Sequence, residues 1–395
     1  MLQTDVEDTS SSSPKQEVEQ QEQGNQNGRV GIRQRLKHFT FAWFLSTMST
    51  GGLAIALAET PHQFNGLYYI GLALFFFNIV LFLTLCTCML TRGILYPAHF
   101  KRSFLHPQES FFVGSFWLSI SVIIGGIQTY GITYGPGYRW LIDAVYVLYW
   151  IYAACSLLNS VGQYWVLMQW SVVRPIPYLT SIFLAGYSAM LTGTIASLIA
   201  GTQPPDRAVL VIVSGCAYQG FGWCISLVSI VVFIRNLIGN GPPPPQLRPG
   251  MFIPVGACAY TVVALIGQAN AIPEYGYFAK HPSAAETLRV VALFVGIFVW
   301  LFAFWIFSIA FLCNITVVGK MTFSLTWWAL IFPNVGFMLS TEMIGKELES
   351  KGILWVASVM TVLLVMMWLV SVVGCARAVW TGGIVREGRD EDKGR

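Results

Sequence analysis

MTFSLTWWALIFPNVGFMLST, residues 321–341, is the most informative stretch of this sequence. It is apolar and long enough to cross a bilayer as a helix, which takes about 20 residues. Pro333 and Asn334 nevertheless lie near its centre, where they weaken a helix and where hydrogen-bonding partners are scarce. Such groups persist at mid-depth in a membrane where they are buried in protein or line a cavity. Two interpretations follow: Phe332 is a plug in a pore, or the proline is an ordinary kink packed among helices.

The rest of the chain predicts an all-α membrane protein around this stretch. Of its residues 55% are hydrophobic and 11% are charged, against about 25% charged in soluble proteins. We expect a ten-span domain, residues 39–377, between a disordered cytoplasmic N-terminal tail, 1–38, and a cytoplasmic C-terminal tail, 378–395. The ten apolar runs that are long enough to cross a bilayer lie near 39–58, 66–90, 110–133, 141–168, 178–201, 208–234, 251–271, 288–313, 321–341 and 353–377.

The distribution of basic residues predicts the orientation of these spans. Ten spans place both termini on one side of the membrane, and 17 of the 23 Lys and Arg residues then fall on that side. Because basic residues concentrate in cytoplasmic loops, we expect both termini in the cytoplasm.

Groups suited to catalysis or metal binding are scattered along the chain. The eight cysteines lie in or at the ends of apolar runs, without the spacing of a disulfide framework or a zinc site, and the five histidines are spread over loops and tails. A membrane enzyme needs such groups gathered near the membrane surface. We therefore expect no enzyme activity, no metal, no cofactor and no nucleic-acid partner. A receptor or scaffold that conducts nothing stays open as an alternative.

Small residues distinguish two kinds of span. Gly, Ala, Ser and Thr fill 49 of the 110 positions in the odd-numbered spans but only 30 of the 131 positions in the even-numbered ones. Small residues belong where helices approach closely or where a passage needs room. We expect five hairpins around a central pore, each with an inner odd helix and an outer even helix; ordinary close packing without a passage is the alternative.

The inner spans also carry polar side chains and glycine pairs such as Gly51-Gly52. Asp, Glu, Lys, Arg and His are absent from the middle of every span, and Glu59 and Glu342 fall at span ends. A neutral, hydroxyl-lined passage therefore fits better than a carboxylate proton relay. The candidate pore-lining residues are Thr47, Thr50, Ser121, Thr194 and Thr261.

Basic residues precede the inner spans on the expected cytoplasmic side. Arg174, Arg248 and Lys320 are candidates for attracting an anionic substrate to the mouth of the passage. The inner helices begin on the same side, so the positive ends of their dipoles also face that mouth. The alternative is that these residues only satisfy the positive-inside rule.

Four segments resemble a known family. RLKHFTFAWFLSTMSTGGLAIAL at 35–57, TQPP at 202–205, RPGMFIPVG at 248–256 and WWALIFPNVGF at 327–337 are similar to fungal malic acid and four-carbon dicarboxylate transporters. These belong to the tellurite-resistance/dicarboxylate transporter family, which also contains plant slow anion channels and yeast sulfite efflux pumps. The likeness runs from about residue 35 to residue 377.

The resemblance implies ten helices in five hairpins around a pore, three protomers assembled with one pore each, and a phenylalanine of the ninth span that occludes the pore. Phe332 matches that gate, and Pro333 matches the bend beside it. The function it implies is transport of malate, and of succinate or fumarate, across the plasma membrane. Small organic acid anions and the lipid bilayer are then the partners. A sulfite efflux pump or an anion channel on the same scaffold is the alternative.

Overall fold

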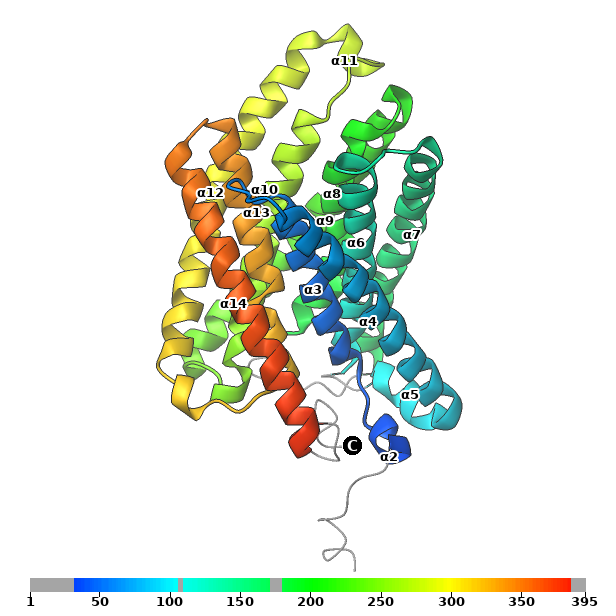
Figure 1. Cartoon of the computed structure of the whole chain (residues 1–395), viewed down its shortest axis with the longest axis vertical. Coiled ribbons are helices and arrows are strands. Elements are labelled where there is room, and N and C mark those ends of the chain that lie inside the picture. The colour runs from blue at the N-terminus through cyan, green and yellow to red at the C-terminus, as the bar shows by residue number, and fades with distance from the viewer. Residues whose placement is uncertain (1–31, 106–108, 171–179, 385–395) are drawn as a thin grey trace, which may run out of the picture.

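The computed structural model describes residues 32–105, 109–170 and 180–384. All regular structure in these ranges is helical. The long helices run side by side along the bundle, with α2 and α5 at its lower end and α11 at its upper end (Figure 1). The expected tails lie largely outside the described residues, although residues 32–37 of the N-terminal one form α2 (Ile32–Lys37).

Helices of two kinds alternate along the chain. Those that match the odd spans are α3 (Phe44–Ala58), α6 (Val113–Gly126) with the π-helical turn η4 (Ile127–Thr133), α8 (Ile182–Ile199), α10 (Ile253–Asn270) and α13 (Phe332–Glu347). Those that match the even spans are α4 (Leu67–Leu95), α7 (Arg139–Trp170), α9 (Pro205–Asn240), α12 (Pro282–Ile315) and α14 (Lys351–Thr381). The short helices between them are α5 (Pro97–Leu105) and α11 (Tyr277–Lys280).

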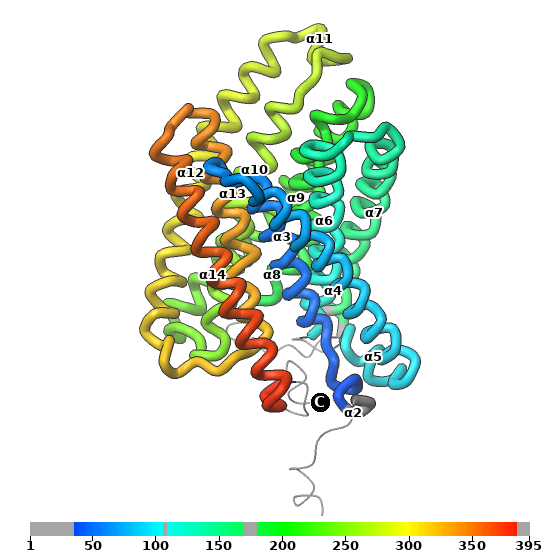
Figure 2. The backbone as a smooth tube through the Cα atoms, in the orientation of Figure 1, coloured from blue at the N-terminus to red at the C-terminus, as the bar shows by residue number. Residues whose placement is uncertain are grey.

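Burial separates the two kinds as their composition predicts. In the first, third, fifth and seventh spans, 67–94% of the residues in an apolar 18-residue segment are buried. The corresponding share in the even-numbered spans is 22–28%. Large apolar side chains of the even helices are exposed on the outside of the bundle, where lipid would cover them. The expected inner position of the odd helices is confirmed. The last outer helix, α14, contacts the first inner helix, α3. Figure 2 shows these two helices in red and blue, so the two ends of the chain's helical part meet.

The ninth expected span is not one continuous helix, and its expected bounds were wrong. A 3-10 segment, η8 (Leu325–Leu330), precedes α13, which ends only at Glu347. Pro333 lies in the first turn of α13, where a missing N–H costs no intrahelical hydrogen bond, so it begins a helix instead of kinking one. Among the described residues nine helical segments are long and apolar enough to cross a membrane, whereas α13 has 16 residues.

Candidate functional site

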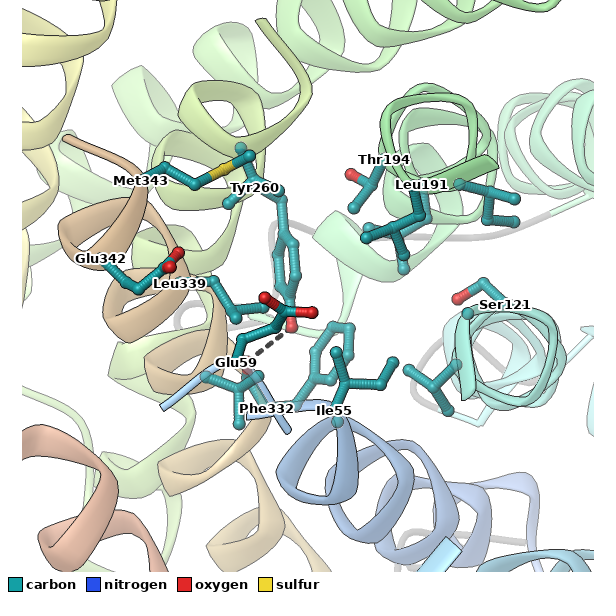
Figure 3. A pocket seen from close by; sticks show the side chains of 17 residues that line it. Ile55, Glu59, Ser121, Leu191, Thr194, Tyr260, Phe332, Leu339, Glu342 and Met343 are labelled. Carbon is teal, nitrogen blue, oxygen red and sulfur yellow. Dashed lines mark hydrogen bonds between the residues drawn. The ribbon is translucent and has the colours of Figure 1, made fainter. Parts of the chain in front are cut away.

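A cavity of about 120 Å³ lies among the inner helices (Figure 3). This volume holds several water molecules, since one needs about 10–15 Å³ by the same measure. All five inner helices supply residues to its wall: for example Gly52 from α3, Ser121 from α6, Thr194 from α8, Tyr260 from α10 and Phe332 from α13.

Phe332 lies on the cavity wall between Tyr260 and Ile55 (Figure 3). Its side chain is 2% exposed. The ring stacks on that of Tyr260, with 4.9 Å between centroids and 28° between planes. The Tyr260 hydroxyl donates a hydrogen bond of 3.1 Å to the Phe332 carbonyl oxygen. Tyr260 thus holds both the ring and the main chain at the start of α13.

Two glycines allow the start of α13 to approach its neighbours closely. A Cβ on Gly52 would lie 3.1 Å from Cδ2 of Phe332, and one on Gly256 would lie 3.3 Å from Cβ of Pro333. Both contacts are tighter than ordinary van der Waals packing. Glycine therefore lets α3 approach the Phe332 ring and lets α10 approach Pro333.

Two of the predicted pore-lining residues, Ser121 and Thr194, line this cavity. The Ser121 hydroxyl donates to the carbonyl of Leu118 in its own helix, at 2.7 Å. Thr194 is 8% exposed, and its Oγ1 has no hydrogen-bond partner among the described residues. The cavity wall therefore includes one residue, Thr194, whose buried hydroxyl is not satisfied by the described residues.

The other three, Thr47, Thr50 and Thr261, lie between helices and not on the cavity wall. The Thr47 hydroxyl is 2.6 Å from that of Ser119 on α6. Thr50 accepts a hydrogen bond of 3.0 Å from the indole of Trp368 on α14, and Thr261 accepts one of 2.9 Å from the side-chain amide of Gln219 on α9. These hydroxyls connect neighbouring helices, a use that composition alone does not separate from lining a passage.

Of the three predicted anion-attracting residues the structure describes two, Arg248 and Lys320, and neither lines the cavity. The Arg248 guanidinium donates to the carbonyl oxygens of Cys313 at 2.6 Å and Pro243 at 2.9 Å, so it caps the end of α12. Lys320 is exposed after α12. Arg174 lies outside the described residues.

A charged cluster that the sequence placed at span ends lies at one end of the cavity. Glu59 and Glu342 line the cavity, and Glu342 is 2% exposed. Lys346 forms ion pairs with both, directly with Glu342 and at 3.7 Å with Glu59. The Tyr134 hydroxyl donates to Glu59 at 3.4 Å. Partial burial raises the pKa of Tyr134 to about 12, so this hydroxyl is a neutral donor.

Sequence reasoning missed Glu342 because it ended the ninth span at residue 341. The later start and end of α13 bring this carboxylate inside the helix and onto the cavity wall. The available signal was the four-residue spacing of Glu342 and Lys346, which favours an ion pair on one face of a helix.

The inner helices surround an internal cavity whose wall carries an aromatic ring, an unsatisfied hydroxyl and, at one end, a charged cluster. This arrangement defines a membrane transport protein for a small polar solute. The family model of the voltage-dependent anion channels, SLAC1, matches residues 38–376. This chain belongs to that family and is a membrane protein of anion transport, not an enzyme.

Curated relatives extend the same likeness. The malic acid transport protein of Schizosaccharomyces pombe is 33% identical over 367 residues, which cover 92% of this chain and 83% of the relative. The sulfite efflux pump SSU1 of Trichophyton rubrum is 26% identical over 342 residues, which cover 85% of this chain and 89% of the relative.

Proposed function

We propose that this protein transports four-carbon dicarboxylate anions, malate first and succinate or fumarate with it, across the plasma membrane. Both termini are cytoplasmic in this proposal, and three protomers assemble with one passage each. The observation that carries it is the cavity to which all five inner helices contribute. The similarity to a malic acid transport protein over 92% of the chain supports malate as the substrate.

In this proposal Phe332 is the gate of the passage. Its ring is buried on the cavity wall, at the point where irregular backbone meets the start of α13. Pro333 fixes that start, and Ser121 and Thr194 provide polar contacts on the opposite helices. A ring that rotates away from Tyr260 would widen the cavity without moving a helix, because the Phe332 carbonyl is held separately by the Tyr260 hydroxyl.

The membrane potential sets the energetics of such a passage. Moving one charge across the membrane is worth about 2.3 kcal/mol per 100 mV. An inside-negative potential therefore drives efflux of a dianion. Uptake requires a monoanion, a proton or a steep concentration gradient.

Sulfite efflux is the second candidate, because a sulfite efflux pump matches 85% of the chain. Flux into liposomes that contain the purified protein separates the two functions. We expect radiolabelled malate to enter faster than sulfite, and unlabelled succinate to compete with malate. Sulfite flux without malate flux would contradict the proposed substrate. The molecular mass of the detergent-solubilised protein tests the trimer.

A further inference from the structure

We propose that Lys346 is an anion-binding residue at one end of the cavity, and that protonation of Glu342 releases it to bind a carboxylate of the substrate. This inference rests on the proposed function. It assigns a role to a charged cluster that the gate at Phe332 leaves unexplained.

The position of Lys346 suits this role. It lies one turn after Glu342 on α13, and its side chain is 55% exposed while that of Glu342 is 2% exposed. The lysine therefore reaches from the solvent-accessible end of α13 to a carboxylate buried in the cavity wall. A substrate that enters at this end meets the ammonium group before it meets Phe332.

The charges around Glu342 explain why a proton is needed. The groups that face it are Lys346 on its own helix, Glu59 at the end of α3, and the neutral Tyr134 beside Glu59. Two carboxylates and one ammonium group leave one net negative charge, which repels an incoming anion. Adding a proton to Glu342 brings the cluster to neutrality and leaves Lys346 with one partner.

Exchange of partners at Lys346 then avoids an unpaired buried charge. A buried carboxylate that loses its ion pair is strongly destabilised, whereas the protonated form is not. The proton binds to a Glu342 oxygen, a substrate carboxylate takes the place of Glu342 at Lys346, and the proton leaves when the original ion pair forms again. No covalent bond to the substrate is made.

Thr194 supplies an independent sign of a ligand at this site. Its buried hydroxyl lacks a partner among the described residues, and such groups are costly unless a ligand or water satisfies them. In Figure 3 it lies on α8, across the cavity from Glu342 on α13. A cationic group near one wall and a hydroxyl on the other suit an anion with polar groups at both ends.

Malate flux at two pH values tests the inference. Liposomes have the same pH, 5 or 7, on both sides, so that no proton gradient is present. KM is expressed as the concentration of malate monoanion at each pH, and because malate titrates identically for all variants, only differences between variants are interpreted. The variants are Glu342→Gln and Lys346→Gln. Lys280→Gln, an exposed lysine on α11, is the matched control.

We expect wild-type protein and K280Q to show a lower KM for malate at pH 5 than at pH 7. E342Q should have the low KM at both pH values, because its side chain is always neutral. K346Q should raise the KM at pH 5 by about tenfold or more, the usual effect of losing a hydrogen bond to a charged group. Wild-type pH dependence in E342Q, or a K346Q variant that behaves like K280Q, would overturn the inference.

Thermal unfolding with and without malate separates this inference from the proposed function. If malate raises the melting temperature of wild-type protein at pH 5 but not that of K346Q, the binding site stands even when liposomes show no malate flux, and only transport fails. If malate stabilises wild type and K346Q equally, or neither of them, the inference is wrong. The melting temperatures without malate also show whether each variant is folded.

Discussion

Phe332→Ala is expected to increase malate flux, because the ring lies in the wall of a cavity to which all five inner helices contribute. The substitution leaves the main chain in place. The Phe332 carbonyl oxygen still accepts the Tyr260 hydroxyl at 3.1 Å, and Pro333 still begins α13. The change is therefore confined to the space that the ring occupies.

The size of the increase follows from what holds the ring. Its stacking on Tyr260 at 4.9 Å is worth about 0.5–1.5 kcal/mol beyond ordinary burial. Since about 1.4 kcal/mol corresponds to a factor of ten, this contact alone favours the closed position of the ring about two- to tenfold. Removing the ring should raise flux by at least that factor. Contacts with Gly52 add to it.

Phe337→Ala is the matched control, with the same substitution on the same helix. The Phe337 ring is 3% exposed and packs away from the cavity, with its centroid 5.3 Å from that of Trp300 and 5.5 Å from that of Phe307, both on α12. Removing it should cost about 3–5 kcal/mol of stability, as for a packed core phenylalanine. Phe332→Ala should cost less, since one side of that ring borders the cavity.

The assay is radiolabelled malate uptake into liposomes at equal amounts of folded protein, with melting temperatures measured in parallel. We expect F332A to show the higher flux and F337A the lower melting temperature. The proposed gate is refuted if F332A carries no more malate than wild type while remaining folded, or if both variants increase flux equally, which would indicate general loosening of the bundle.

Further substitutions test other contacts. Tyr260→Phe removes one hydrogen bond from the start of α13 but keeps the ring that stacks on Phe332, so thermal unfolding should show a loss of about 0.5–1.5 kcal/mol while malate flux stays unchanged. Thr194→Val should raise the KM for malate, whereas Thr261→Val should lower the melting temperature and leave the KM unchanged, because Thr194 lines the cavity and Thr261 bonds to Gln219 between helices. Arg92→Met leaves the fully buried carboxylate of Glu109 without its 3.0 Å ion pair, and thermal unfolding should show a loss of about 3–5 kcal/mol.

The arrangement of inner and outer helices could be predicted from the sequence because it has a compositional cause. Helices that contact neighbours on all sides need small residues, and helices that face lipid do not. The family resemblance and the burial pattern agree on this point. Composition does not distinguish the faces of an inner helix from one another, because nearly all of its residues are buried. Ser121 and Thr47 were therefore equivalent in the sequence, although only Ser121 lines the cavity.

The start of α13 could not be predicted for a related reason. Apolar residues continue on both sides of Pro333, so hydropathy indicates one span with a proline inside it. A proline in a first helical turn gives the same pattern. Because Pro333 lies in the first turn, α13 begins and ends later in the sequence than the expected span. Glu342 therefore lies within the helix and on the cavity wall, not at the end of a span.

The hydroxyl groups of the inner helices explain how this break is stable inside a membrane. Irregular backbone at mid-depth requires partners for its carbonyl groups, because lipid offers none. Ser49 on α3 donates to the carbonyl of Trp328 at 2.8 Å, and Tyr260 on α10 donates to that of Phe332. The same inner helices that surround the cavity thus satisfy the backbone beside it. These two bonds hold the main chain on either side of the break without using the Phe332 side chain, which is why substituting that ring tests the gate separately from the fold.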